Sequence, residues 1–273
     1  MSEIEIHALY EGTFSVATDK IFNRIGRKDK PHKGALKLSI NPFLIRDPEK
    51  TILFDAGIGD LFGGDTSIDT ILDNLDEHGV SDFEVTDIFI SHLHFDHMGG
   101  LANRKNGYWD LTFPDADIWV SEDGWKKLSA GIDKKNDDEQ EFFFYLDSQD
   151  NVRFMDSEAS PIQHVRVERI GGHTEHHYAL YYENGSHKFI MAGDVIGTKG
   201  AINRTYSAKY DFDPDQSMKM REELQKKAYE EGYAFLAYHE TDSPIFKLTD
   251  HDPKKGYTIE PLSGSGSESG SGS

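Results

Sequence analysis

His92-Leu-His-Phe-Asp-His97 is the stretch of this sequence that decides its fold. Four side chains that can bind a metal fall within six residues, directly after the apolar run 85–90 and before Gly99-Gly100. Imidazole nitrogens and carboxylate oxygens are ligands that Zn²⁺ accepts readily. If a strand ends at Ser91, the first two histidines point to one side of an extended segment. The aspartate and the last histidine then reach a second point, so one loop could serve two metal ions.

Chance explains this stretch poorly. Histidine is common, with 13 in 273 residues. With the chain's own His and Asp frequencies, the pattern is still expected in only roughly one of 300 such chains. A purely structural zinc site is also disfavoured, because such sites are closed and rich in thiolate. The chain has no cysteine, which further excludes disulfides and a cysteine nucleophile.

The composition is that of a globular and strongly acidic chain, with 37% hydrophobic residues and a formal net charge of −20. This charge disfavours nucleic acid and anionic membrane surfaces as partners. No apolar run approaches the ~18–20 residues of a transmembrane helix. The first residues, 1–6, are acidic and lack the pattern of a secretory signal. We therefore expect a cytoplasmic monomer or homodimer that acts on a small molecule.

Strand and helix patterns alternate along two halves of the chain. In the first half, periodicity and turn residues predict strands at 4–9, 36–45, 51–54, 85–90 and 116–120, and helices at 66–78 and 122–129. In the second half they predict strands at 152–155, 165–170, 178–182, 188–192 and 233–238, and a helix at 215–232. Two β-rich halves with flanking helices predict an α+β fold, a four-layer αββα sandwich.

Two segments fall outside this alternation of strands and helices, residues 130–150 and 263–273. Residues 130–150 are acidic and aromatic, and could form a lid or a helix packed by its aromatic face; packing is favoured. Residues 263–273 contain only Gly, Ser and one Glu, the composition of a flexible linker with the regularity of an appended segment. We therefore predict a single domain over residues 1–262.

Further candidate ligands stand where predicted strands end. A two-metal site needs about seven ligand side chains. His173 follows strand 165–170 after two glycines, Asp194 follows strand 188–192, and His239 follows strand 233–238. Each alone is a weak signal, since a lone polar residue after a strand is more often a cap or turn residue. Together, in this order, they are a specific pattern.

With this order of ligands the sequence resembles the metallo-β-lactamase-fold hydrolase superfamily over most of residues 4–250. Segments 41–45 and 53–57 look like the early strands of that family and its Asp-x-Gly turn. Residues 92–97 look like those of lactonases, and 210–217 are similar to the methyl parathion hydrolase-like group. The resemblance is therefore closest to the lactonase and organophosphate-hydrolase branch.

The resemblance implies a role for each candidate residue. It implies one metal held by His92, His94 and His173, a second held by Asp96, His97 and His239, and Asp194 bridging both. The metals would be two divalent ions, Zn²⁺ first, with iron or manganese as alternatives. Three further residues are candidates for supporting roles. Asp55 would orient a ligand or be a plain turn residue, His177 would support the site, and Tyr206 would donate to substrate or merely pack.

The chemistry expected of such a site is hydrolysis by a hydroxide that bridges two metals, which attacks a carbonyl carbon or phosphorus. Asp96 or Asp194 could take or relay the proton. The chain has no Gly-x-Ser-x-Gly elbow, which agrees with a mechanism that needs no serine nucleophile. We expect lactone, ester or phosphotriester substrates. The alternatives are an iron-dependent oxidoreductase and a metal-stabilised binding protein without catalytic activity.

Overall fold

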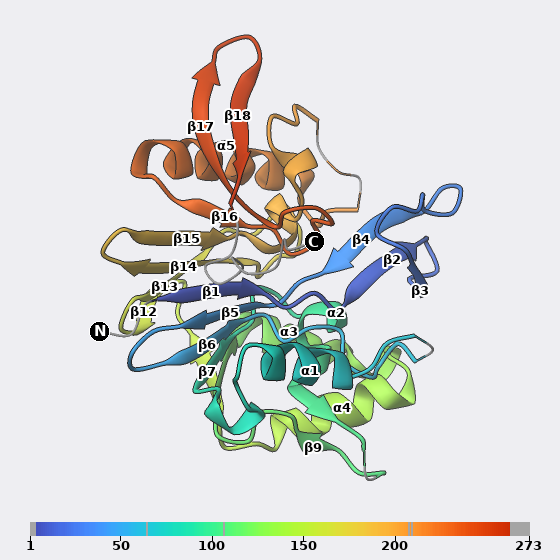
Figure 1. Ribbon diagram of the computed structural model, residues 1–273. Coiled ribbons are helices and arrows are strands. Elements are labelled where there is room, and N and C mark those ends of the chain that lie inside the picture. The colour runs from blue at the N-terminus through green and yellow to red at the C-terminus, as the bar shows by residue number, and fades with distance from the viewer. Residues whose placement is uncertain (1–3, 64, 106, 207, 209, 263–273) are drawn as a thin grey trace, which may run out of the picture.

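Two β-sheets lie face to face, with helices on the outer face of each (Figure 1). The computed structural model describes residues 4–63, 65–105, 107–206, 208 and 210–262. The predicted linker, 263–273, lies outside the described residues. The layers, in order, are helices, sheet, sheet and helix, which confirms the predicted α+β fold.

The first sheet has six strands in the order β1-β5-β6-β7-β10-β11. Its strands are β1 (Glu5–Ala8), β5 (Phe43–Arg46), β6 (Thr51–Phe54), β7 (Asp87–Phe89), β10 (Asp117–Ser121) and β11 (Val152–Met155). The pairs from β1 to β6 are antiparallel and those from β6 to β11 are parallel. Parallel strands are covered on both faces, which explains their nearly continuous apolar runs.

The second sheet has seven strands in the order β12 to β18. Its strands are β12 (Glu158–Ile162), β13 (Val165–Arg169), β14 (Tyr178–Asn184), β15 (His187–Met191), β16 (Ala234–Leu236), β17 (Ile245–Asp252) and β18 (Gly256–Pro261). Only β15 and β16 pair in parallel. As a result β13, β15 and β16 all run in one direction and end at the same edge of the sheet.

Alternation along the strands separates the layers. In β6, Ile52 and Phe54 pack into the core between the sheets, whereas Leu53 joins the core under the helices. In β14, Leu180 packs between the sheets and Tyr181 packs under α5. Successive strand residues point to opposite faces, so each strand supplies two cores. Both sheets contribute to one core, as expected of a single domain. The bounds of that domain, residues 1–262, stay a prediction.

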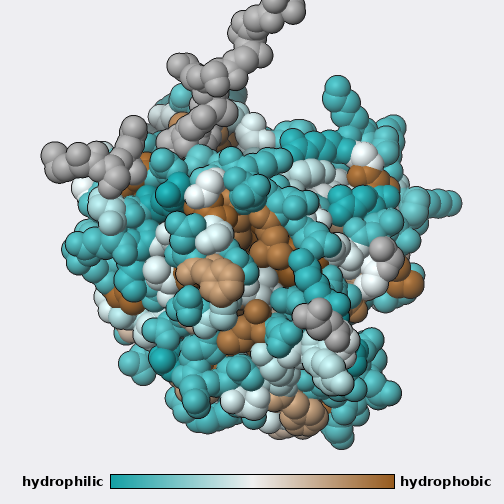
Figure 2. Space-filling view, turned by 60° about the horizontal axis from the view of Figure 1, so that its bottom comes forward, coloured by the Kyte–Doolittle hydropathy of each residue, from teal (hydrophilic) through white to brown (hydrophobic). Residues whose placement is uncertain are grey.

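The helices α1, α3, α4 and α5 cover the outer faces of the sheets, whereas the short helix α2 and several 3₁₀ turns join the strands. The α-helices are α1 (Asp69–Glu77), α2 (Phe95–Met98), α3 (Glu122–Gly131), α4 (Asp137–Asp147) and α5 (Pro214–Glu231). The 3₁₀ turns are η1 (Asp82–Glu84), η2 (Gly99–Leu101), η3 (Ile132–Lys134), η4 (Gly193–Ile196) and η5 (Lys199–Ala201). Among the described residues, no helix is both long and apolar enough to cross a membrane. The face seen in Figure 2 is mainly hydrophilic, with hydrophobic residues gathered near its centre.

A small three-stranded sheet projects beside the first sheet (Figure 1). It consists of β2 (Gly12–Val16), β3 (Phe22–Ile25) and β4 (Leu36–Ile40), and a separate pair is formed by β8 (Ala102–Asn103) and β9 (Asp110–Leu111). The single strand predicted at 36–45 is therefore wrong, because it divides into β4 and β5 in different sheets. Asn41 turns inward at the break and donates from Nδ2 to the carbonyls of Tyr238 and Glu240, at 2.7 and 2.9 Å. Pro42 has no N–H to continue a ladder.

Segment 130–150 forms η3 and α4. Phe142 and Phe143 are fully buried against the outer face of the first sheet, whereas Phe144 remains 54% exposed. Asn136 caps α4 by accepting from the N–H of Glu139 at 2.9 Å. The aromatic residues therefore pack a helix onto the domain, as was favoured from the sequence.

Candidate metal centre

The predicted ligands meet at one edge of the sandwich because the strands that precede them end there. His92 and His94 follow β7, and Asp96 and His97 lie on α2. The remaining three follow the co-directional strands of the second sheet: His173 after β13, Asp194 in η4 after β15, and His239 after β16. All seven lie in two adjoining groups.

The first group contains His92, His94, His173 and Asp194. His94 Nδ1 lies 2.9 Å from His92 Nε2 and 3.2 Å from His173 Nε2. His173 Nε2 lies 3.1 Å from Asp194 Oδ2. One nitrogen cannot hold the protons needed to satisfy both neighbours, whereas a shared cation would satisfy all of these lone pairs.

The second group contains Asp96, His97 and His239. His97 Nε2 and His239 Nε2 each lie 3.8 Å from Asp96 Oδ2. They lie 3.2 and 3.0 Å, respectively, from Asp194 Oδ1. Asp194 therefore directs one carboxylate oxygen to each group, the arrangement expected of a bridging ligand.

The chemistry of these atoms fits divalent metal ions. His97 Nε2 and Asp194 Oδ1 are buried and make no hydrogen bond with any described residue. Burial alone would raise the pKa of Asp194, but His239, His173 and His97 outweigh it and hold that pKa well below its usual range. Burial and the neighbouring histidines His97, His177 and His94 lower the pKa of His92. Burial alone would lower the pKa of His97 and of His239, but the charge of Asp194 outweighs it and raises both. Metal ligands must be neutral imidazoles and charged carboxylates, so a bound ion would displace the protons of these two histidines.

Asp55 orients His97, the candidate ligand that is completely buried. Its Oδ2 accepts from His97 Nδ1 at 2.6 Å and from Ser91 Oγ at 2.8 Å, and its Oδ1 accepts from Ser91 N at 2.7 Å. Asp55 is fully buried and adopts a left-handed backbone with φ of 59°. A non-glycine residue in that conformation is uncommon and needs compensating contacts, which these three hydrogen bonds supply. Of the two alternatives for Asp55, the structure places it in contact with a candidate ligand.

Two other candidate ligands are oriented through Nδ1. His173 Nδ1 donates to Asp211 Oδ1 at 2.9 Å, and His239 Nδ1 donates to the carbonyl of Ser39 at 2.9 Å. In both cases Nε2 is left free to face the cluster. Sequence reasoning missed Asp211 and Ser39. For Asp211 a signal existed, since it lies in the stretch 210–217, but nothing in the sequence connects it with His173.

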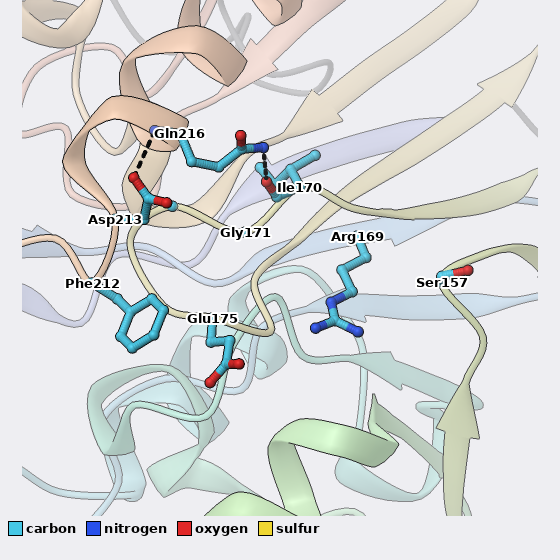
Figure 3. A pocket seen from close by; sticks show the side chains of 9 residues that line it. Ser157, Arg169, Ile170, Gly171, Glu175, Phe212, Asp213 and Gln216 are labelled. Atoms are coloured by element: carbon cyan, nitrogen blue, oxygen red, sulfur yellow. Dashed lines mark hydrogen bonds between the residues drawn. The ribbon is translucent and has the colours of Figure 1, made fainter.

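The loop that carries His173 is held from outside by the start of α5 (Figure 3). Gln216 Nε2 donates to the carbonyl of Ile170 at 2.9 Å, and the N–H of Gln216 donates to Asp213 Oδ1 at 3.0 Å. Gly172 lies against Ser217 with φ of 95°, and a Cβ there would come within 2.7 Å of the Ser217 backbone. The loop therefore needs glycine to reach this position.

His177 and Tyr238 pack behind the cluster. The ring of His177 stacks on His92 with centroids 4.4 Å apart, and its Nε2 donates to the carbonyl of Ala192 at 3.1 Å. Burial lowers the pKa of His177 to about 3, so the ring is neutral. The ring of Tyr238 stacks on His97 at 4.0 Å, and its hydroxyl donates to the carbonyl of Asp96 at 2.6 Å. The predicted supporting role of His177 agrees with these contacts.

Several cavities border the cluster, one of them lined by His94 and Asp96. Two others share the lining residues His94, His173, Lys20 and Tyr210. Tyr206, the tyrosine singled out from the sequence, is 67% exposed and lines neither. The ring of Tyr210 lies 6.1 Å from that of His173. Within the described residues, Tyr210 is thus the tyrosine that lines the cavities beside the cluster, whereas Tyr238 packs behind it.

Comparison with known structures supports the same architecture. A probable metal-dependent hydrolase from Staphylococcus aureus has 21% identity and a TM-score of 0.75, covering 96% of this chain and 98% of its own. The hydrolase AbOPH of the β-lactamase superfamily has 22% identity and a TM-score of 0.77, covering 96% of each chain. AidC, a dizinc quorum-quenching lactonase, has 21% identity and a TM-score of 0.74, also covering 96% of each chain.

At these identities the likeness establishes the fold. No curated protein sequence matches the chain. A family model described as the metallo-beta-lactamase superfamily matches residues 36–238, which include the candidate ligands up to Asp194 and end directly before His239. The chain belongs to the metallo-β-lactamase superfamily.

Proposed function

We propose that this chain is a metal-dependent hydrolase that holds two divalent ions, Zn²⁺ in the first place, and cleaves lactones, esters or phosphotriesters. The observation that supports this most is the position of Asp194. Its two carboxylate oxygens point to two separate groups of histidines, at 3.1 Å on one side and 3.0–3.2 Å on the other. Neighbours of the same fold described as a dizinc lactonase and as metal-dependent hydrolases favour the same class.

The proposed ligands are the seven predicted from the sequence. His92, His94 and His173 would hold one ion, Asp96, His97 and His239 the other, and Asp194 both. When bound, such ions lower the pKa of a water molecule and polarise the carbonyl or phosphoryl oxygen of the substrate. Asp96 has a partly exposed carboxylate beside His97 and His239, where it can take the proton of the attacking water.

The substrate would enter through the cavities beside the cluster. His94 and Tyr210 line both of them, so the reacting group would meet the ligands from that side. This open approach disfavours a closed structural site, the alternative in which the metals only stabilise a binding protein. It also makes a small molecule the expected partner.

Replacement of Asp194 tests the proposal. Asp194→Ala should remove metal from both groups and abolish nearly all hydrolysis of an acyl-homoserine lactone, an aryl ester and a paraoxon-like triester. Elemental analysis and the three assays measure this. Asp73→Ala, at an exposed position on α1, is the matched control and should retain both. Full metal content and full activity in the Asp194→Ala protein would sink the proposal. Bound iron with oxygen uptake, and no hydrolysis, would favour an oxidoreductase instead.

A further inference from the structure

We propose that the cavity between β2, β4 and the segment after η5 selects substrates with an anionic group, a carboxylate in the first place, on an apolar chain. This proposal deepens the proposed function and rests on it. We call this space the arm cavity; it is the one lined by Val16, Lys20, Leu36, Leu38 and Arg204, among others.

The arm cavity joins apolar walls to the candidate metal centre. Its volume is about 520 Å³, large enough for an acyl chain of moderate length. Val16, Leu36 and Leu38 contribute aliphatic side chains from the projecting sheet, and Ala201 contributes a methyl group from η5. His94, His173, Asp194 and His239 form its inner end. A substrate with its reactive carbonyl at that end would place its apolar portion between these walls.

The charge of the arm cavity is opposite to that of the protein. The chain carries 49 acidic and 29 basic residues. The residues that line the arm cavity include two basic side chains, Lys20 and Arg204, and one acidic side chain, Asp194. Asp194 already faces the histidines of the cluster, so its charge does not neutralise the two cations. A cavity with local positive charge in an acidic protein favours an anionic ligand.

These two cations also lack the partners that neighbouring cations have. In the adjoining cavity, Lys127 forms an ion pair with Glu175 at 2.6 Å and Lys135 with Glu139 at 3.6 Å. The side chains of Lys20 and Arg204 make neither an ion pair nor a hydrogen bond with any described residue. The guanidinium of Arg204 lies 5.2 Å from the centroid of the Tyr206 ring, and its Nε is buried without a hydrogen-bond partner among the described residues. A buried donor left unpaired is costly, and an anionic ligand would satisfy it.

Arg221 adds to the local positive charge. Its side chain is fully buried, and its Nη2 also lacks a hydrogen-bond partner among the described residues. Burial lowers the pKa of Arg221, and the nearby charge of Arg204 lowers it further. Asp211 opposes this effect but is already bonded to His173. The region around Arg204 therefore holds more positive than negative charge, and a carboxylate bound there would relieve the repulsion.

A matched pair of esters tests the selectivity. 4-Nitrophenyl octanoate and mono-4-nitrophenyl suberate have acyl chains of equal length, and only the second ends in a carboxylate. We expect kcat/KM to be about tenfold higher for the suberate ester, since a hydrogen bond to a charged group contributes enough for one such factor. Arg204→Gln and Lys20→Gln should each lower this ratio several-fold. Arg204→Lys should keep most of it, and Lys219→Gln, exposed on α5, should not change it.

A binding measurement separates this proposal from the proposed function. Titration calorimetry on the metal-loaded protein compares octane-1-sulfonate, a weak metal ligand, with octan-1-ol. Tighter binding of the sulfonate that is lost in Arg204→Gln supports the selectivity, even if no ester is hydrolysed and the hydrolase proposal fails. Hydrolysis of both esters at equal kcat/KM, with no preference for the sulfonate, would overturn the selectivity and leave the hydrolase proposal standing.

Discussion

The candidate ligands on the two sides of the cluster differ in how firmly the protein encloses them. On the closed side, His97 is fully buried between Asp55 and Tyr238, and His239 is buried against Ser39, although it also lines the inner end of the arm cavity. On the open side, His94 is exposed and lines both cavities, as does His173. The ligands of the closed side are therefore held in place by buried contacts, whereas those of the open side face the cavities through which a substrate can approach.

The supports of the two sides differ in the same way. Asp55 accepts three hydrogen bonds in the dry interior and holds a left-handed backbone conformation. Among the described residues, the side chain of Asp211 makes one hydrogen bond, to His173, from a loop at the mouth of the cavities. This difference implies that a loss on the closed side should affect folding as well as metal binding. A loss on the open side should affect metal binding more than folding.

Asp55→Ala should have the largest effect. It leaves Ser91 N–H, Ser91 Oγ and His97 Nδ1 without their acceptor, and each unpaired buried group costs about 1–3 kcal/mol. Several kcal/mol is a large part of the stability of an ordinary domain. Urea denaturation should therefore show a much lower free energy of unfolding, and elemental analysis should show reduced metal. If stability and metal content were unchanged, as in Asp73→Ala, the closed side would not support folding and metal binding as we infer.

Asp211→Ala should have a smaller and more selective effect. His173 would lose the acceptor that orients its ring, and the loss of such an outer contact typically weakens metal affinity about 10–100-fold. Two-step Zn²⁺ titration of the metal-depleted protein should show one weakened site and one unchanged site. The free energy of unfolding should fall less than in Asp55→Ala, because one buried donor rather than three loses its acceptor. Asp211→Asn should lie between, because its amide oxygen still accepts from Nδ1. Equal weakening of both sites would show that the two sides are not independent.

The sequence predicted the ligands better than their supports for a physical reason. Each ligand follows a strand, and strand ends are visible in hydrophobic patterns, so His173, Asp194 and His239 could be found. Asp211 lies 38 residues from His173 in a loop without periodicity, and only tertiary folding brings them together. The same limit explains why the sequence indicated Tyr206, whereas in the structure Tyr210 lines the cavities.

The fold shows the same division between local and distant determinants. Most strands of the two main sheets and the helices α1, α3 and α5 follow from periodicity, within a few residues at their ends, but β12, β17 and β18 were not predicted. Strand β2 was missed because its polar residues Thr13 and Ser15 are buried, and Thr13 is satisfied by a side-chain hydrogen bond to Ser39 at 2.8 Å. The break between β4 and β5 depends on contacts of Asn41 with residues almost 200 positions away. Such pairings are absent from any local pattern.

Glu11 is a further buried acidic residue on the closed side, but it is not one of the candidate ligands. Its carboxyl is buried, with Oε2 accepting from the N–H of Ile58 at 2.9 Å and Oε1 without a hydrogen-bond partner among the described residues. Burial raises the pKa of Glu11 from 4.5 to about 8, although the Ile58 hydrogen bond and the charge of Arg24 partly oppose this. The acid is therefore mainly neutral at pH 7 in the folded protein and ionised in the unfolded chain.

The expected effect of Glu11 on stability is the smallest of the three and depends on pH. Because the folded state binds the extra proton, the contribution of Glu11 to stability is fully present below pH 4.5 and is lost as pH rises through about 8. Glu11→Gln has no proton to lose, so its free energy of unfolding should fall less between pH 5 and 8.5 than that of the wild type. Urea denaturation across that range measures the difference, with Glu77→Gln at an exposed position on α1 as the control. Parallel pH profiles for wild type and Glu11→Gln would mean that water reaches Glu11, and that the closed side is less dry than its burial implies.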